Sequence, residues 1–391
     1  MTMSNTDVIV AGAGPVGLVA AAVLAQAGLK VTLLEKREQL NQASKASTFH
    51  PPTLTILDML GVFGIMESHA QHVGSQQYRT TERGVIGDLS YRLLEGLTPH
   101  PFRKHLEQAR LTPLLLEKFR ALPNAQVHFG AELASIDSND GQGVTVTVSQ
   151  DGGRQQLKAR YLLGTDGAHS RVREAAGIAF DAKPYPGRVL RARAEPASLD
   201  RILPGMAAIT YLVSDTHSAS FLRMPDCWRI ILRVPAGVSD EAAMADDWIF
   251  ERMHALVPSM QTLPELVGRD VYGASKAVAA QNRAGNVYLC GDAAHLTNTR
   301  GGMNMNCGIH DSYAVGRAMA LAVRNGDEGA LHAAAAERLR VASEVLLPRT
   351  DSMVSQEGSW IERVSKLLGD PGHARDYLYK SAMLDMVDLS A

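Results

Sequence analysis

Three glycines near the start of the chain carry the clearest chemical signal. Gly12, Gly14 and Gly17 follow the apolar run DVIVA and open an alanine-rich stretch, so a strand, a tight turn and a helix fall in register. In such a turn, the first glycine makes the bend, the second admits a pyrophosphate close to the backbone, and the third lets the helix pack on the strand. Pro15 suits the first helical turn. Glu35 lies ~20 residues further on, at the end of the next strand, where a carboxylate can accept hydrogen bonds from a ribose. The pattern predicts a dinucleotide site and does not separate FAD from NAD.

Two more polar turns follow apolar runs later in the chain. Asp166 to Arg173, DGAHSRVR, comes directly after the run 161–164, and Gly291 to His295, GDAAH, follows the run 287–290. Polar turns after buried parallel strands lie at the carboxyl edge of a sheet, which is where ligands bind in open α/β folds. We therefore expect the three turns to meet along one long cofactor.

The elements that must position these turns indicate an α/β chain with an additional, mainly antiparallel sheet. Apolar spacing predicts a helix over 108–122, and alternation predicts a hairpin from 127–136 and 144–148, inserted into the nucleotide-binding part. The strand candidates of the second sheet are 188–195, 207–214, 218–224 and 228–234, with a helix from about 240 to 256. Helical patterns then cover 307–324 and 328–347 and continue to the C-terminus.

Length and composition limit the classes of function. A chain of 391 residues has room for about two domains. A net charge of −2 without a basic stripe gives no nucleic-acid footprint, and no run approaches the ~20 apolar residues that span a bilayer. The three cysteines have no ligand-like spacing, which favours a reducing compartment and no structural metal. We find no signal-peptide pattern at the start and expect a soluble, cytoplasmic protein.

With the three motifs together, the sequence resembles the FAD-dependent aromatic hydroxylases of the para-hydroxybenzoate hydroxylase type, which are single-component flavoprotein monooxygenases. The resemblance extends from Asp7 to about Asp351. It implies a Rossmann-like FAD-binding domain of this type, with an interleaved, mainly antiparallel substrate domain and C-terminal helices. We expect the FAD-binding domain in 1–74, 106–180 and 277–350, the substrate domain in 75–105 and 181–276, and a helical segment in 351–391.

The resemblance also implies the cofactor contacts. Asp166 and Ser170 would serve both FAD and NAD(P)H, Asp292 would hold the ribityl chain, and Lys45 stands where many members carry arginine. The motifs and the resemblance together place FAD against Gly12, Gly14, Pro15, Gly17, Glu35, Lys36, Lys45, Gln108, Asp166, Gly167, Ser170, Gly291, Asp292, Gly302, Met305 and Asn306.

The chemistry implied is hydroxylation of a small phenolic or heteroaromatic ring. NADPH or NADH would reduce FAD, O2 would form a C4a-hydroperoxide, and the ring would need –OH or –NH2 as an activating group. The cofactor performs the difficult step while the protein positions and shields it. No protein nucleophile is required, and a homodimer is possible.

The chain departs from the family pattern after GDAAH. It has Asn298-Thr299 in place of a common Pro-Pro step, and Asn304 where glycine is usual. Asparagine tolerates positive φ better than most residues, so the loop could keep its shape. Thr299, Arg300 and Asn304 are our candidates for residues beside the flavin ring that affect catalysis.

We expect the substrate contacts in the second sheet. Tyr211 and Arg223 are the candidates, with Trp228 and Arg233 as further ones, although such residues more often serve packing or solvation. His295 is interpreted as a structural hydrogen-bonding residue, and no partner for His50 or His310 can be identified from the sequence.

Two other functions are compatible with the scaffold. A halogenase or reductase on the same scaffold is one, but the tryptophans, Trp228, Trp248 and Trp360, do not form the WxWxIP-type segment of such halogenases. The other is a catalytically weak flavin-binding homologue, for which the loop departures, chiefly Asn304, are the argument.

Overall fold

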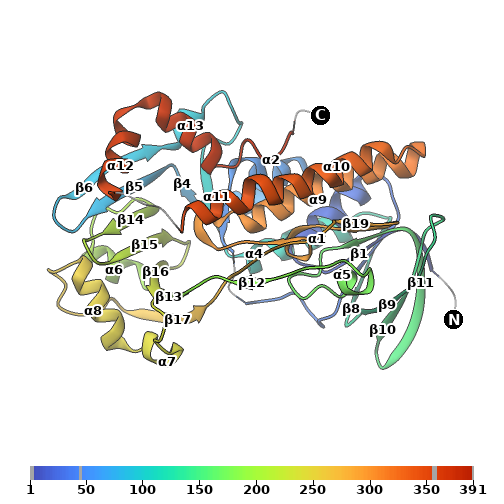
Figure 1. Cartoon of the computed structure of the whole chain (residues 1–391), viewed down its shortest axis with the longest axis horizontal. Helices are drawn as coiled ribbons and strands as arrows, with labels where there is room; N and C mark the ends of the chain where they lie inside the picture. Colours follow the sequence, from blue (N-terminus) through green and yellow to red (C-terminus); the bar gives the residue numbers. More distant parts are fainter. Residues whose placement is uncertain (1–3, 44–45, 355–358, 390–391) are drawn as a thin grey trace.

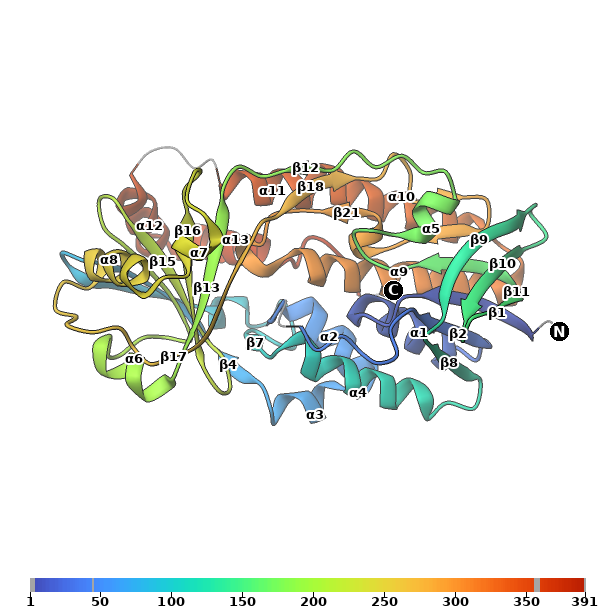
Figure 2. The ribbon, with the colours of Figure 1, turned by 90° about the horizontal axis from the view of Figure 1, so that it is seen from below.

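The computed structural model describes residues 4–43, 46–354 and 359–389. It has two units side by side along its long axis, each built on its own sheet (Figures 1 and 2). The predicted α/β class, with a second, mainly antiparallel sheet and C-terminal helices, is confirmed.

The first sheet is parallel at its centre. Its strands lie in the order β19 (Arg283–Ala284), β20 (Val287–Leu289), β11 (Gly153–Gly164), β1 (Ser4–Ala11), β2 (Val31–Glu35) and β8 (Ala125–Phe129). All neighbours along this path run parallel except β19 and β20. The carboxyl ends of β1, β11 and β20 therefore lie at one edge, as the sequence predicted.

The alternation of β1 decides which core each side chain joins. Val8 and Val10 pack into the core under the helices α1 (Pro15–Gln26), α4 (Gln108–Arg120), α9 (Asn304–Asn325) and α10 (Gly329–Arg340), whereas Ile9 and Ala11 face the hairpin β9 (Glu132–Asn139) and β10 (Val144–Gln150). Because both faces are covered, these strands read as nearly continuous apolar runs.

One strand boundary differs from the expectation. The predicted strand 127–136 is divided into β8, which belongs to the parallel sheet, and β9, which starts the hairpin. Gly130, with φ +65°, separates the two strands. A backbone turn of this kind favours glycine, and this local signal explains why one alternating run became two strands.

The second sheet has the order β17 (Leu266–Tyr272), β13 (Arg188–Ala194), β16 (Trp228–Val234), β15 (Ser218–Arg223), β14 (Ile209–Val213), β5 (Ser75–Thr80) and β6 (Gly84–Ser90). Only the pair β14 and β5 is parallel along this path. Trp228, Ile230 and Leu232 pack under α6 (Pro196–Ile202) and α8 (Asp246–Leu256). The opposite face meets the C-terminal helices α12 (Trp360–Gly369) and α13 (Pro371–Ser381) beside β5 and β6.

Small sheets connect the two units. One contains β12 (Lys183–Pro184), β18 (Ser275–Val278) and β21 (His295–Leu296), and the other contains β3 (Thr48–Phe49), β7 (Arg103–His105) and β4 (Gln71–Val73). The remaining elements are α2 (Pro51–Met59), α3 (Phe63–Glu67), α5 (Arg171–Ala175), α7 (Asp240–Ala243) and α11 (Leu347–Ser352), the 3-10 turns η1 (Tyr91–Leu94), η2 (Gly291–Ala293) and η3 (Arg300–Gly302), and the π-helix η4 (Val341–Leu346). Within the described residues, no helix combines the length and hydropathy that crossing a bilayer requires.

Candidate functional site

A pocket lies at the carboxyl edge of the parallel sheet, between the turns that follow β1 and β11. Seven of the predicted cofactor residues line it: Gly12, Gly14, Glu35, Lys36, Gln108, Asp166 and Gly167. Lys45 lies outside the described residues. The tertiary structure therefore brings the first two motifs together around one space.

The three glycines of the first turn have different surroundings. Gly12 has φ +103°, and a Cβ on it would lie 2.7 Å from the Thr165 carbonyl oxygen. A Cβ on Gly17 would lie 1.8 Å from the Gly12 carbonyl oxygen, so close packing of the helix requires this glycine. A Cβ on Gly14 would meet nothing within 4 Å, so its backbone borders open space. Pro15 is buried at the first turn of α1 and packs rather than lining the pocket.

Glu35 is held in place by the turn itself. One carboxylate oxygen accepts a hydrogen bond from the Ala13 N–H at 2.9 Å, and the other accepts from the Arg37 N–H at 3.0 Å. A carboxylate has about four acceptor positions, so both oxygens can accept further hydrogen bonds from a ligand.

Thr112 and Asn41, which none of the sequence motifs includes, also line this pocket. Thr112 lies one helical turn after Gln108 on α4, so helical spacing from Gln108 would have found it. Its hydroxyl is buried and has no hydrogen-bond partner among the described residues. A buried polar group without a partner at a pocket wall suits a bound polar ligand.

The second motif divides into two tasks. The Ser170 hydroxyl donates to Asp166 at 2.5 Å and accepts from the Arg173 N–H at 2.9 Å, which caps α5. Ser170 is fully buried and does not line the pocket, so its side chain stabilises the turn. Asp166 and Gly167 remain at the pocket. Burial raises the pKa of Asp166, against the hydrogen bonds that favour its charged form.

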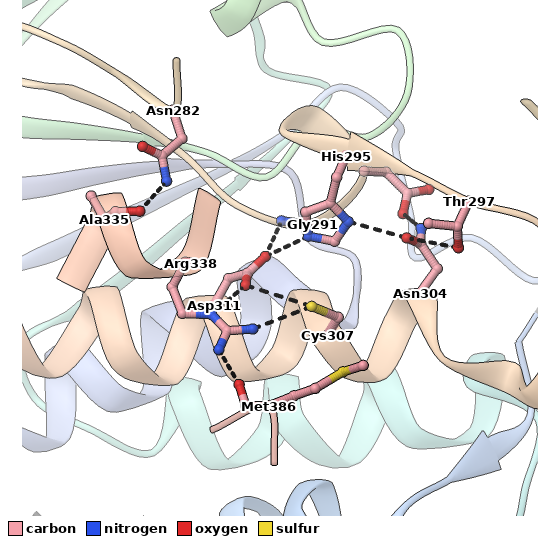
Figure 3. Close-up of polar contacts among 11 residues, drawn as sticks. Asn282, Gly291, His295, Thr297, Asn304, Cys307, Asp311, Ala335, Arg338 and Met386 are labelled. Atoms are coloured by element: carbon pink, nitrogen blue, oxygen red, sulfur yellow. Dashed lines mark hydrogen bonds and ion pairs between the residues drawn. The ribbon is translucent and has the colours of Figure 1, made fainter. Parts of the chain in front are cut away.

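The third motif rests on a buried network of charges (Figure 3). The Asp311 carboxylate binds His295 Nε2 at 2.7 Å and Arg338 Nε at 2.7 Å, and it accepts a hydrogen bond from the Gly291 N–H at 3.1 Å. Burial alone would lower the pKa of His295, but the Asp311 charge outweighs it and raises that pKa well above the ordinary value. Burial likewise opposes the ionisation of Asp311, yet Arg338 and His295 hold its pKa below the ordinary value. The network is thus two cations around one carboxylate.

Asn304 joins this network to Asp292. Its carbonyl oxygen lies 3.1 Å from His295 Nδ1, and its amide nitrogen donates to Asp292 at 2.8 Å. Since a protonated imidazole donates from both nitrogens, His295 fixes which way the amide faces. The interpretation of His295 as a structural residue agrees with this geometry.

His295, Cys307 and Asp311 also have ligand atoms within 4.8 Å of one another. Arg338 already binds Asp311, and its Nη2 lies 3.2 Å from the Cys307 sulfur. A metal ion here would face the charge of this buried guanidinium. We therefore interpret the cluster as an ion-pair network that supports the GD turn.

The loop after GDAAH turns most of its side chains inward. Asn306 accepts from the His50 N–H and donates to the carbonyls of Thr48 and Gly302, so its amide is fully used within the protein. Met305 is buried in the core of the first unit. Neither side chain has the exposed position expected of a direct cofactor contact. The loop instead offers backbone groups, including those around Gly302, which has φ +64°.

Thr299 and Arg300 lie at the outer side of this loop. Thr299 is exposed, and Arg300 donates to the Met353 carbonyl. Burial and the nearby charge of Arg233 lower the pKa of Arg300 to about 10. Arg300 of the loop and Arg233 of the second sheet therefore form a pair of nearby cations.

Tyr211 and Arg223 lie on opposite faces of the second sheet. Arg223 pairs with Trp228, whose side chain packs on the face under α6. Tyr211 pairs with Ser220, which shares the other face with Leu222 and its partner Arg229. The Tyr211 ring stacks on the Tyr78 ring with 5.6 Å between the two ring centroids, and burial raises the pKa of Tyr211 to about 12. One small substrate between the sheet and the first unit cannot contact both side chains, and the geometry leaves only Tyr211 on that side. The missed residue is Arg229, which reaches Ser47 and Glu107 of the first unit.

The chain is similar in sequence to known proteins. A family model described as FAD binding domain matches residues 5–347. Para-nitrophenol 4-monooxygenase of Pseudomonas sp. (strain WBC-3) is 30% identical over 324 residues, which cover 82% of this chain and 79% of that protein. The chain belongs to the FAD-dependent aromatic monooxygenases of the para-hydroxybenzoate hydroxylase type.

Other members of this family extend the similarity over nearly the whole chain. The 6-hydroxy-3-succinoylpyridine 3-monooxygenase HspB of Pseudomonas putida (strain DSM 28022 / S16) is 28% identical over 391 residues, covering 95% of this chain and 96% of that protein. The crystal structure of p-nitrophenol 4-monooxygenase PnpA from Pseudomonas putida DLL-E4 superposes with a TM-score of 0.88 at 25% identity, covering 98% of this chain and 99% of the other.

Proposed function

We propose that this flavoprotein is an NAD(P)H-using, single-component monooxygenase that hydroxylates a small phenolic or heteroaromatic substrate. The main support is the convergence of three polar turns, after β1, β11 and β20, at one edge of a parallel sheet, with a second sheet beside them. The relatives named for a nitrophenol and a hydroxypyridine support this substrate class. O2 as co-substrate, a cytoplasmic location and a possible homodimer stay predictions.

The pocket residues fit the adenosine and pyrophosphate part of FAD. The open space at Gly14 lies at the N-terminus of α1, where free N–H groups and the helix dipole favour phosphate. Glu35 would accept hydrogen bonds from the ribose, and Gln108 and Thr112 would bind the polar chain beyond it.

The flavin end would lie against the third motif. Asp292, held by Asn304, would bind the ribityl chain. The first N–H groups of α9, a helix of 22 residues, have no acceptor within the helix, and they would stabilise negative charge on the flavin ring. When bound, FAD accepts hydride from a nicotinamide and activates O2 for insertion into the ring.

A catalytically weak homologue is the alternative function. The argument for it is that Asn304 stands where glycine is usual. In the structure the Asn304 side chain is turned toward His295 and Asp292 and is held by both. This orientation supports an adapted loop and favours the monooxygenase.

The test is oxidation of NADH and of NADPH by the FAD-loaded protein with a panel of phenols and hydroxypyridines. We expect at least one ring compound to accelerate oxidation and to gain one oxygen atom from labelled O2, detected by mass spectrometry. Bound FAD without any acceleration across the panel would reject the monooxygenase and favour the weak homologue.

A further inference from the structure

The small sheet β3–β7–β4 presents a buried basic face to the second unit. Arg103 and His105 lie two residues apart on β7 and so point to the same side. The register pairs Thr48 with His105 and Phe49 with Lys104. One residue further along the same antiparallel register, His50 lies opposite Arg103. His50, Arg103 and His105 are at most 3% exposed. They therefore form one cluster on one face, which we call the basic face.

Each member of the basic face is anchored through one polar atom. His50 Nε2 lies 2.8 Å from the Gly301 carbonyl oxygen, and His105 Nδ1 lies 2.8 Å from the Arg223 carbonyl oxygen. Arg103 Nη2 donates to the Ser381 carbonyl at 2.7 Å, and its guanidinium lies over the Tyr91 ring. These anchors come from the flavin-side loop, the second sheet and the C-terminal helix.

Each member also keeps one buried polar atom without a hydrogen-bond partner among the described residues. These atoms are His50 Nδ1, Arg103 Nε and His105 Nε2. Leaving buried polar atoms unpaired is costly, so a cluster of three indicates a place for something polar.

The anchors decide what the free atoms can do. A carbonyl oxygen only accepts hydrogen bonds, so the proton of His50 lies on Nε2 and that of His105 on Nδ1. The free imidazole atoms are then lone-pair acceptors, while Arg103 Nε is a donor. Burial is the main cause that lowers the pKa of His105 to about 4 and that of His50 well below its ordinary value, so both are neutral at neutral pH.

The basic face lies next to the proposed reaction centre. Val73 on β4 pairs with Arg103 and packs with Tyr78, Tyr91 and Leu378 in the core between the second sheet and the C-terminal helices. On the other side, His50 is bound to Gly301, in the loop that would face the flavin ring.

We propose that the basic face is the subsite for the ring –OH or –NH2 group of the aromatic substrate. The substrate group would donate its hydrogen to an imidazole lone pair, His105 Nε2 or His50 Nδ1, and the Arg103 Nε–H would donate to the substrate oxygen or nitrogen. This inference rests on the proposed function and names residues for its substrate site.

The arrangement also supplies a proton acceptor. In this step the O–H bond of the substrate group breaks, its electron pair stays on the substrate oxygen, and the proton forms an N–H bond with the imidazole lone pair. The free imidazole nitrogen can take this proton because it carries an unshared lone pair.

Substitutions can remove each free atom and keep its anchor. His105→Asn retains an amide N–H near the Nδ1 position, and His50→Gln retains one near Nε2, but neither places a lone pair at the position of the free imidazole nitrogen. Arg103→Met removes the donor. His72→Asn is the matched control, because His72 pairs with Lys104 on the opposite face of the same sheet.

The measurement is the affinity of the oxidised, FAD-loaded protein for 4-nitrophenol and for its methyl ether, 4-nitroanisole, followed by the flavin spectrum. We expect the phenol to bind about 10–100-fold more tightly than the ether, because the ether leaves the acceptors unpaired. This preference should fall to a few-fold or less in Arg103→Met and in at least one histidine variant, and it should persist in His72→Asn.

An unchanged preference in all three variants, or no binding of either ligand, would overturn the subsite. If a variant loses FAD or melts early, Arg103→Lys, which keeps the charge, should recover part of the preference.

A pH profile separates proton transfer from packing: in the affected histidine variant, kcat/KM should rise with the ionisation of the phenol. If the protein hydroxylates phenols but the variants keep the preference for 4-nitrophenol over 4-nitroanisole, the subsite is rejected and the proposed function is retained.

If the variants lose this preference but the protein hydroxylates no phenol, the subsite is retained and the proposed function is rejected.

Discussion

At the scale of single residues, Asn304 is the most informative departure from the family pattern. It is the link between a buried imidazolium and the carboxylate proposed to hold the ribityl chain. A side-chain amide can donate and accept at once, whereas glycine has no side chain to do either. Asn304, the departure from the family pattern, thus helps to hold Asp292 in the site.

We predict that Asn304→Gly binds FAD about tenfold more weakly, because Asp292 loses a hydrogen bond whose absence costs roughly 1–3 kcal/mol. Asn304→Asp should be weaker still, since it places a second negative charge beside Asp292. The FAD dissociation constant, measured by flavin fluorescence, checks both. Equal affinity of Asn304→Gly and the original protein would contradict the proposed link.

The His295–Asp311 pair predicts how stability depends on pH. The folded pKa of His295 is raised, so its contribution is complete below the ordinary histidine value, about 6.5, and is lost as the pH rises through the raised value. The difference in unfolding free energy between the protein and His295→Gln, which does not titrate, should therefore shrink on the alkaline side. Urea unfolding at several pH values tests this, and a difference that stays constant would refute it.

At the scale of elements, the approach of α9 to the GD turn is the close contact that the sequence did not reveal. A Cβ on Gly308 would lie 2.8 Å from the Gly291 Cα and 2.8 Å from Val16 Cγ2. The turn, α1 and α9 therefore meet where only a glycine fits, and this contact holds the third motif against the first.

We predict that Gly308→Ala lowers the unfolding free energy by roughly 1–3 kcal/mol, because it overpacks this contact, and that it weakens FAD binding. Gly64→Ala is the control, since a Cβ there meets nothing within 4 Å. Thermal melting of both variants, with and without FAD, gives the comparison. Similar melting temperatures for the two would show that α9 can move aside.

At the scale of the whole molecule, the C-terminal helices complete the second unit. Leu378 of α13 is fully buried against Tyr78 and Tyr91, and the same helix anchors Arg103. The two units are therefore coupled through residues that are 278 positions apart in the chain.

We predict that Leu378→Ala lowers the unfolding free energy by about 2–5 kcal/mol, as for other large-to-small changes in a core. It should also weaken phenol binding while leaving FAD affinity nearly unchanged, because the FAD pocket lies in the first unit. Isothermal titration with each ligand separates the effects, and a parallel loss of FAD would contradict this division.

The sequence by itself determined the βαβ unit, the three polar turns and the second sheet. Each follows from local physics: glycines where a turn or a close contact needs them, and apolar periods that set helix or strand. The motifs therefore identified the family before any side chain was placed.

Only the tertiary structure decided which side chains face one another. Register places Tyr211 and Arg223 on opposite faces, turns Met305 and Asn306 inward, and joins His50 to Arg103 across two strands. Such pairings depend on contacts between distant segments and on a strand period of two, where one step reverses a side chain. The substrate side of the site was for that reason beyond the reach of sequence patterns, whereas the cofactor side was not.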